Sequence, residues 1–82
     1  MIYPIFVMKD LKKGFMSPTV DLNEASALRQ FHMAMVDDHS VIRVHHEDFS
    51  LYKIGEFDNE SGIINAFYSP EFIADATSLV EV

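Results

Sequence analysis

Two segments that are apolar on both faces of a strand constrain this fold more than any other feature. Residues 2–8 (IYPIFVM) and 49–57 (FSLYKIGEF) are rich in aromatic and β-branched side chains, which favour strands. Successive strand residues point to opposite faces, yet neighbours such as Ile5 and Phe6 are both apolar. A strand with one face in water should instead alternate with polar residues. A small sheet built from these segments therefore needs cover on both faces.

One long helix is predicted between the two segments, over Leu22–Val36. Asp21 as N-cap would place Glu24 at the third helical position, close to a capping box, and Asn23 is a rival cap. The three-and-four spacing gives an apolar stripe of two rows, Leu28, Phe31, Met35 and Ala25, His32, Val36. One helix covers one sheet face. The other face must meet the C-terminal segment, a second subunit or a ligand with flat apolar surfaces, such as unstacked bases.

The first half of the chain adds a hairpin before the helix. Residues 10–14 form a lysine-rich turn, and residues 15–20 run back as a second strand that Ser17-Pro18 interrupts. Pro4 indicates an edge position or a bulge in the first strand. Asp37 to Ser40 end the helix as a loop, and residues 41–44 are expected to be extended.

The second half adds another hairpin and a short terminal helix. Residues 58–62 form a tight connection in which Gly62 can adopt positive φ, and residues 63–68 return as the partner strand. Ser69-Pro70 resembles a helix start, with a helix expected over residues 72–79. The predicted class is α+β: a small, mainly antiparallel sheet in ββαββ order, with one main helix and a short C-terminal helix or tail.

Length and composition indicate one folded domain over residues 1–82. A chain this short buries a small core, so oligomerisation would stabilise it. It contains no cysteine, which excludes a disulfide framework and suits a reducing cytoplasm. The N-terminal apolar run covers only eight residues without a preceding basic region, so we expect neither a signal peptide nor a membrane span.

The charge of the chain is strongly polarised. Its formal net charge of −7 excludes a protein whose whole surface attracts polyanions. Residues 1–20 nevertheless carry three lysines against one acid, Asp10. From Glu56 onward there are acids and no Lys or Arg. The N-terminal hairpin is therefore basic and the C-terminal third acidic.

Nucleic-acid contacts would need cations for the phosphates and aromatic rings for the bases. The candidate cations are Lys9, Lys12, Lys13, Arg29, Arg43 and Lys53. The candidate stacking rings are Tyr52, Tyr3 and Tyr68, on the sheet face with less cover. In the alternative interpretation the lysines solvate a hairpin and protect an edge strand, and Arg29 pairs with Asp48 or Glu24 as part of the structure.

Metal and catalytic sites are not expected. His45, His46, Glu47 and Asp48 are ligand types, but adjacent histidines in an extended segment point to opposite sides. No H-x-H, H-x-x-x-H or H-E-x-x-H spacing includes His32 or His39. The chain has no cysteine, nucleophile elbow or phosphate-binding glycine loop, so it is predicted not to be an enzyme and to need no cofactor.

Two motifs resemble a known phage family. They are Ala27-Leu28-Arg29-Gln30-Phe31 in the helix and the stretch from Glu47 to Gly62, EDFSLYKIGEFDNESG. The pattern, over residues 2–76, is similar to the small non-structural protein of gokushovirus-type microviruses (Microviridae), tailless phages with single-stranded DNA genomes. The resemblance implies a non-enzymatic protein of the host cytoplasm. It would bind single-stranded DNA and help viral DNA replication shift toward single-strand synthesis and packaging.

A second class of function stays open. The acidic C-terminal third can contact a basic partner, such as a phage replication or packaging protein, or mask the basic hairpin in competition with DNA. In that case the chain is an acidic protein–protein interaction module, either alone or as a homo-oligomer.

Overall fold

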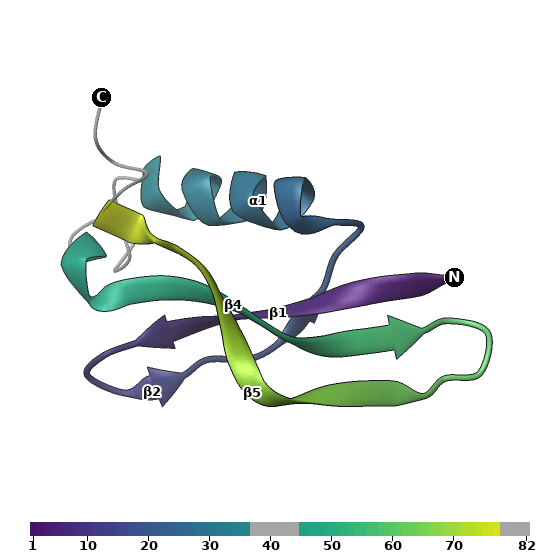
Figure 1. Cartoon of the computed structure of the whole chain (residues 1–82). Coiled ribbons are helices and arrows are strands. Elements are labelled where there is room, and N and C mark those ends of the chain that lie inside the picture. The colour runs from purple at the N-terminus through teal and green to yellow at the C-terminus, as the bar shows by residue number, and fades with distance from the viewer. Residues whose placement is uncertain (37–44, 78–82) are drawn as a thin grey trace.

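A curled, mainly antiparallel sheet lies under one helix in the computed structural model, which describes residues 1–36 and 45–77 (Figure 1). Its elements are β1 (Ile2–Asp10), β2 (Gly14–Phe15), β3 (Thr19–Val20), α1 (Glu24–Val36), the 3-10 turn η1 (His46–Asp48), β4 (Phe49–Asp58) and β5 (Ile64–Asp75). The predicted α+β class with one main helix is confirmed, whereas the ββαββ order is wrong. The predicted loop at 37–40, the extended segment at 41–44 and Arg43 lie outside the described residues.

The N-terminal strand occupies the middle of the sheet. The strand order is β2-β1-β4-β5, and β3 pairs with the same side of β1 as β2. The edge position predicted from Pro4 is therefore wrong: Pro4 faces Glu56 in β4, and its carbonyl accepts a hydrogen bond from the Asp21 backbone N–H at 3.1 Å. The alternative of a bulge holds close by, because the pairing register shifts between Ile5 and Phe6.

Local signals around the first hairpin and the helix start mostly act as predicted. Ser17-Pro18 divides the expected second strand into β2 and β3, each of two residues. At the helix start Asn23 prevails over Asp21 as the cap. The Oδ1 atom of Asn23 accepts the Ser26 backbone N–H at 2.8 Å, and α1 begins at the next residue. The capping box predicted with Asp21 is therefore wrong, because Glu24 is the first residue of the helix.

The core lies between α1 and the near face of the sheet. It consists of Phe6, Ala27, Phe31, Phe49, Leu51 and Ala76, with Met8, Leu28, Ala34 and Ile73 packed against it. The predicted stripe row through Leu28 and Phe31 is confirmed. The row through Ala25 and His32 is wrong, because both side chains are exposed. The side chains of Met35 and Val36 lie outside the described part. The stripe is therefore narrower than its spacing indicated.

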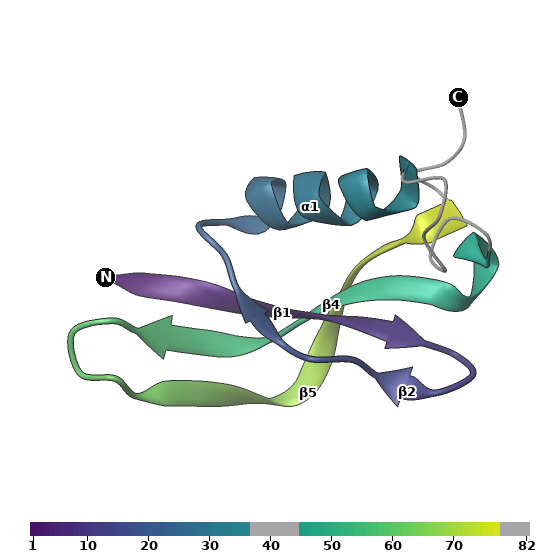
Figure 2. The same ribbon diagram turned by 180° about the vertical axis from the view of Figure 1, so that it is seen from behind.

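The predicted C-terminal helix is replaced by a strand over residues 72–75. β5 runs through Ser69-Pro70 and continues to Asp75, pairing Phe72 with Tyr52. Between the pairs Lys53–Glu71 and Gly55–Ala66, β4 contributes one residue and β5 four, so residues 67–70 bulge out of the ladder. Figures 1 and 2 show the resulting bend of β5. Pro70 lies in this bulge, where its missing N–H breaks no pairing.

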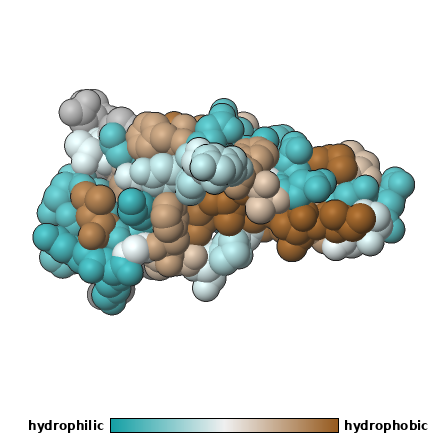
Figure 3. Space-filling model, turned by 60° about the horizontal axis from the view of Figure 1, so that its bottom comes forward, coloured by the Kyte–Doolittle hydropathy of each residue, from teal (hydrophilic) through white to brown (hydrophobic). Residues whose placement is uncertain are grey.

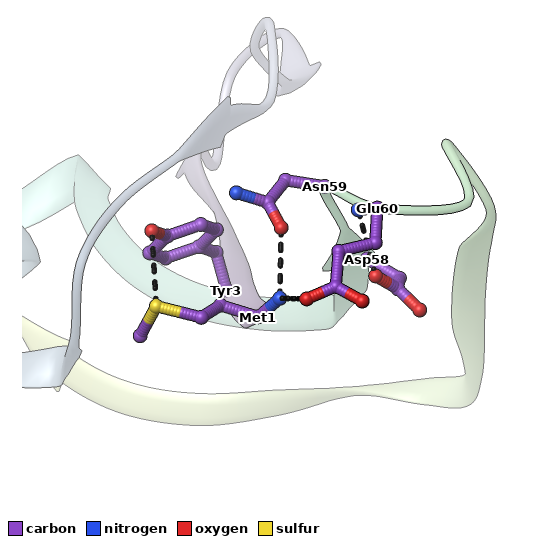
Figure 4. Close-up of polar contacts among 5 residues, drawn as sticks. All are labelled: Met1, Tyr3, Asp58, Asn59 and Glu60. Atoms are coloured by element: carbon purple, nitrogen blue, oxygen red, sulfur yellow. Dashed lines mark hydrogen bonds and ion pairs between the residues drawn. The ribbon is translucent and has the colours of Figure 1, made fainter.

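The turn between β4 and β5 forms as predicted. Gly62 has φ +77°, and its N–H donates to the carbonyl of Asp58 at 2.8 Å. The turn also holds the start of β1 (Figure 4): the Met1 amino group contacts Asn59 Oδ1 at 2.8 Å and Glu60 Oε1 at 3.2 Å. The two chain segments are thus joined at one end of the sheet.

Candidate functional site: the open face of the sheet

The face of the sheet opposite α1, called here the open face, has no covering layer among the described residues (Figures 1 and 2). Phe6 and Leu51 pack into the core, so the alternate residues Val7 and Tyr52 point away from α1. Residues directly opposite each other on antiparallel strands share a face. The cross-strand rows of the open face are Tyr3–Phe57–Ile64, Val20–Ile5–Gly55–Ala66, Val7–Tyr52–Phe72 and Phe15–Lys9–Ser50–Asp75.

The open face is largely apolar. Viewed from below the sheet, hydrophobic residues extend through the middle of the molecule and along the right-hand part (Figure 3). Val20, Ile64, Phe15 and Phe72 are between 50 and 63% exposed. In the middle of this face Ile5 and Val7 are buried, at 6% and 4% exposed. The larger apolar side chains around them lie in water, and the expectation that a further surface covers them stays a prediction.

An aromatic row crosses the open face from β2 to β5. The ring of Tyr52 lies 5.6 Å from Phe15 and 5.7 Å from Phe72, centroid to centroid, with interplanar angles of 76° and 78°. Such edge-to-face pairs hold each ring in a defined orientation. Lys9 lies beside the row, with Nζ 5.1 Å from the centre of the Phe15 ring. The row therefore combines half-exposed rings with one cation.

Lys12 and Lys13 add two further cations beyond Lys9, at the end of the hairpin. Both are exposed in the turn between β1 and β2, which Asp10 fixes. The Asp10 side chain accepts the Lys12 backbone N–H at 2.9 Å, and its carbonyl accepts the Lys13 N–H at 3.0 Å. Asp10 is 7% exposed, so the carboxylate that shapes the turn is buried. The fold thus brings Lys9, Lys12 and Lys13 to one end of the aromatic row.

The other predicted cations lie elsewhere. Arg29 is exposed on α1, on the opposite side of the sheet. In the described part of the chain no ion pair joins it to Glu24 or Asp48. Lys53 faces Phe6 in the register, which places it on the helix side. Its Nζ is 3.9 Å from Glu56 Oε2 and 5.4 Å from the centre of the Phe67 ring. Neither residue extends the Lys9 cluster.

Of the three predicted stacking residues, Tyr52 is at the centre of the row. Tyr3 lies on the open face but at the far end, opposite Phe57, and the fully exposed Tyr68 lies in the bulge of β5. Phe15 and Phe72 are not among the residues that the sequence predicts. Phe15 pairs with Lys9 across the predicted turn, so hairpin pairing alone would have found it. The sequence predicts a helix at Phe72, and no local signal places this residue beside Tyr52.

The histidine and acid stretch is a turn rather than an extended segment. The 3-10 turn η1 brings one ligand atom each from His45, Glu47 and Asp48 within 4.8 Å of one another. The extended segment expected here is therefore wrong, and the side chains of His45, Glu47 and Asp48 converge. His45 and Glu47 are exposed, and exposed acidic groups are often close together without an ion. We assign no metal to this cluster.

The turn between β4 and β5 lowers the pKa of the Asp58 carboxyl. The Glu60 backbone N–H, which donates to Oδ1 at 2.9 Å, lowers the pKa of this carboxyl below 3.8, and Ser61 acts in the same direction (Figure 4). Because the folded pKa is depressed, the carboxylate stabilises the turn above pH 3.8, and this contribution is lost as the pH falls through the folded pKa.

An NMR titration should show Asp58 titrating below a peptide aspartate, and Asp58→Asn should remove this part of the acid sensitivity. A titration midpoint of Asp58 at or above pH 3.8 would contradict the hydrogen bond from the Glu60 N–H to its carboxylate.

No helix within residues 1–36 and 45–77 is both long and apolar enough to cross a bilayer.

Comparison with known proteins gives one finding: the family model for phage ORF5 protein matches residues 3–79. Neither the curated proteins nor the solved structures give a match. The matched range includes every strand and helix described above except Ile2, the first residue of β1.

Proposed function

Because the chain belongs to the phage ORF5 protein family, we propose that it is a non-enzymatic phage protein that binds single-stranded DNA in the host cytoplasm. In this role it assists viral DNA replication or the switch to single-strand synthesis and packaging. The observation that carries the proposal is the aromatic row Phe15–Tyr52–Phe72, with Lys9 at its β2 end.

The arrangement suits unpaired bases better than a duplex. Single-strand binding combines rings on which bases stack with cations that follow the backbone. Phe15 and Phe72 are half exposed, and Lys12 and Lys13 extend the cationic end beyond Phe15. The acids beyond Glu56 limit the affinity, because they repel phosphates, so binding should be most visible at low salt.

A fluorescence anisotropy titration with labelled single-stranded DNA over a range of salt concentrations tests the proposal. Replacing Lys12 and Lys13 together by alanine should weaken binding and reduce the slope of log affinity against log salt by about 1.4, at roughly 0.7 per phosphate contact. Phe72→Ala should weaken binding at least about fivefold while leaving that slope unchanged, because a stacked ring carries no charge.

Arg29→Ala with Lys53→Ala is the matched control. It removes the same charge from residues that lie away from the row, so it should reproduce only the general effect of a more negative chain. Equal losses in both double variants, or no binding by the native chain at low salt, would reject the proposal.

A second candidate function is an acidic interaction module that contacts a basic phage replication or packaging protein. It is favoured by two acids of the β4–β5 hairpin. Glu56 and Asp58 are two residues apart on β4, so both side chains lie on the helix side of the sheet. The same titration with polylysine in place of DNA separates the candidates. Binding of polylysine together with an absence of DNA binding would support the module.

A further inference from the structure

One end of the sheet, far from the lysine turn, forms an amphipathic arm. We define the arm as residues 2–5 of β1, 55–58 of β4 and 64–66 of β5, joined by the turn of Figure 4. Its side toward α1 carries both acids of the arm, in the mixed rows Pro4–Glu56–Asn65 and Ile2–Asp58. Its open face carries the row Tyr3–Phe57–Ile64 and, next to it, the row Ile5–Gly55–Ala66, in which Ile5 and Gly55 are buried and which Val20 of β3 extends.

The open face of the arm holds no charged side chain, although the chain has a net charge of −7. Nucleic acids and charged partners are attracted by opposite charge, which this patch does not offer. Two copies of an acidic chain repel each other over most of their surfaces. A neutral, apolar patch is the place where they can approach with the least repulsion and with a gain from burial.

A second copy of the chain could contact either the face of the sheet or its outer edge, and the geometry favours the face. β5 is the outer strand of the sheet, and a free outer strand is a template for pairing with another copy. Here the bulge at 67–70 and Pro70 interrupt that edge. Ile64, at 63% exposed, and Val20, at 50%, present their side chains from the open face instead.

We propose that a second copy of this chain covers the open face of the arm, so that the protein forms a two-fold dimer. Such an interface is isologous: Tyr3, Phe57 and Ile64 of one copy meet the same patch of the other. The lysine turns lie at the far ends of the two sheets, so the dimer leaves Lys9 and the aromatic row uncovered.

The size of the patch sets the expected strength. Three strands about 4.8 Å apart over about four residues give a face of roughly 13 by 14 Å. Two such faces bury on the order of 400–500 Å² in total, which is below the roughly 1,200 Å² at which stable specific interfaces begin. The dimer is therefore expected to be weak, with a dissociation constant of roughly 0.1–1 mM and with monomer and dimer in exchange on dilution.

Sedimentation equilibrium of the full chain across about 1 µM to 1 mM tests this inference. The native chain should rise from 9.4 kDa toward twice that mass. Ile64→Glu should raise the dissociation constant at least tenfold. Asn65→Glu, which adds the same charge one residue away on the side toward α1, should change it by less than about threefold. Circular dichroism melts of both variants check that they fold equally well, as expected for exposed positions of β5.

A native chain that stays at 9.4 kDa throughout would overturn the dimer, and equal effects of the two variants would overturn its location. The result does not depend on the DNA titration. Ile64→Glu leaves Lys9, Lys12, Lys13 and the aromatic row in place, so loss of the dimer and loss of DNA binding are separate outcomes.

Discussion

Phe6→Ala should reduce the free energy of unfolding by about 3–5 kcal/mol, the usual cost of emptying a buried phenylalanine site. Phe6 is 2% exposed and belongs to the core cluster under α1. A domain of this size has roughly 4–12 kcal/mol of stability in total. The variant should therefore lose between about a quarter and all of this stability. A thermal melt followed by circular dichroism measures the effect, with an expected fall in Tm of at least about 12 °C.

Phe72→Ala is the matched control for that experiment. It removes the same ring from the open face, where Phe72 is 55% exposed, so it should cost about 1 kcal/mol or less. Much of this cost is the edge-to-face contact with Tyr52. If both variants were destabilised equally, Phe72 would have to be buried, which would contradict an uncovered open face.

Gly55→Ala should produce the second large loss of stability, about 2–3 kcal/mol. A Cβ at this position would lie 2.6 Å from the carbonyl oxygen of Asn65 and 3.1 Å from the Cα of Ala66. Both atoms are backbone, so β4 and β5 would have to separate instead of a side chain moving aside. Urea denaturation measures the free energy of unfolding. Relative to the native chain, the variant should show a larger increase in amide hydrogen exchange in β4 and β5 than in α1.

Gly62→Asn provides the comparison for Gly55. Gly62 has positive φ but nothing within 4 Å of a Cβ, and asparagine adopts this conformation more readily than most residues. This substitution should cost about 1 kcal/mol or less. A Gly55→Ala chain as stable as Gly62→Asn would show that the close approach of the two strands is easily relieved.

The sequence predicts the fold well where local chemistry and tertiary pairing agree. The strand predicted over 49–57 is observed as Phe49–Asp58, and the turn that Gly62 permits is present. The helix start moves by two residues because two good caps, Asp21 and Asn23, stand close together and only the second bonds to the first turn. Asp and Asn have nearly equal N-cap propensities, so propensity alone does not predict which of the two caps the helix.

The largest error arises at Ser69-Pro70, where the local signal for a helix start is sound but pairing with β4 overrides it. A single sequence gives no indication of the four-residue bulge that admits Pro70 into a strand. For the same reason the sequence does not predict Phe72 as part of the candidate site. Lys9, Lys12, Lys13 and Tyr52 were predicted and lie near one another, whereas Lys53 and Arg29 are placed elsewhere by register and by the helix.

The central place of β1 has a consequence for the order of folding during synthesis. β1 is made first, yet its main partner is β4, and the pairs run from Asp10–Phe49 back to Ile2–Asp58. Until residue 58 has left the ribosome, the apolar residues of β1 have only β2, β3 and α1 to pack against. Contacts this distant along the chain slow folding and leave apolar strands exposed meanwhile. The nascent chain should therefore gain protection from proteolysis late, after most of its 82 residues have emerged.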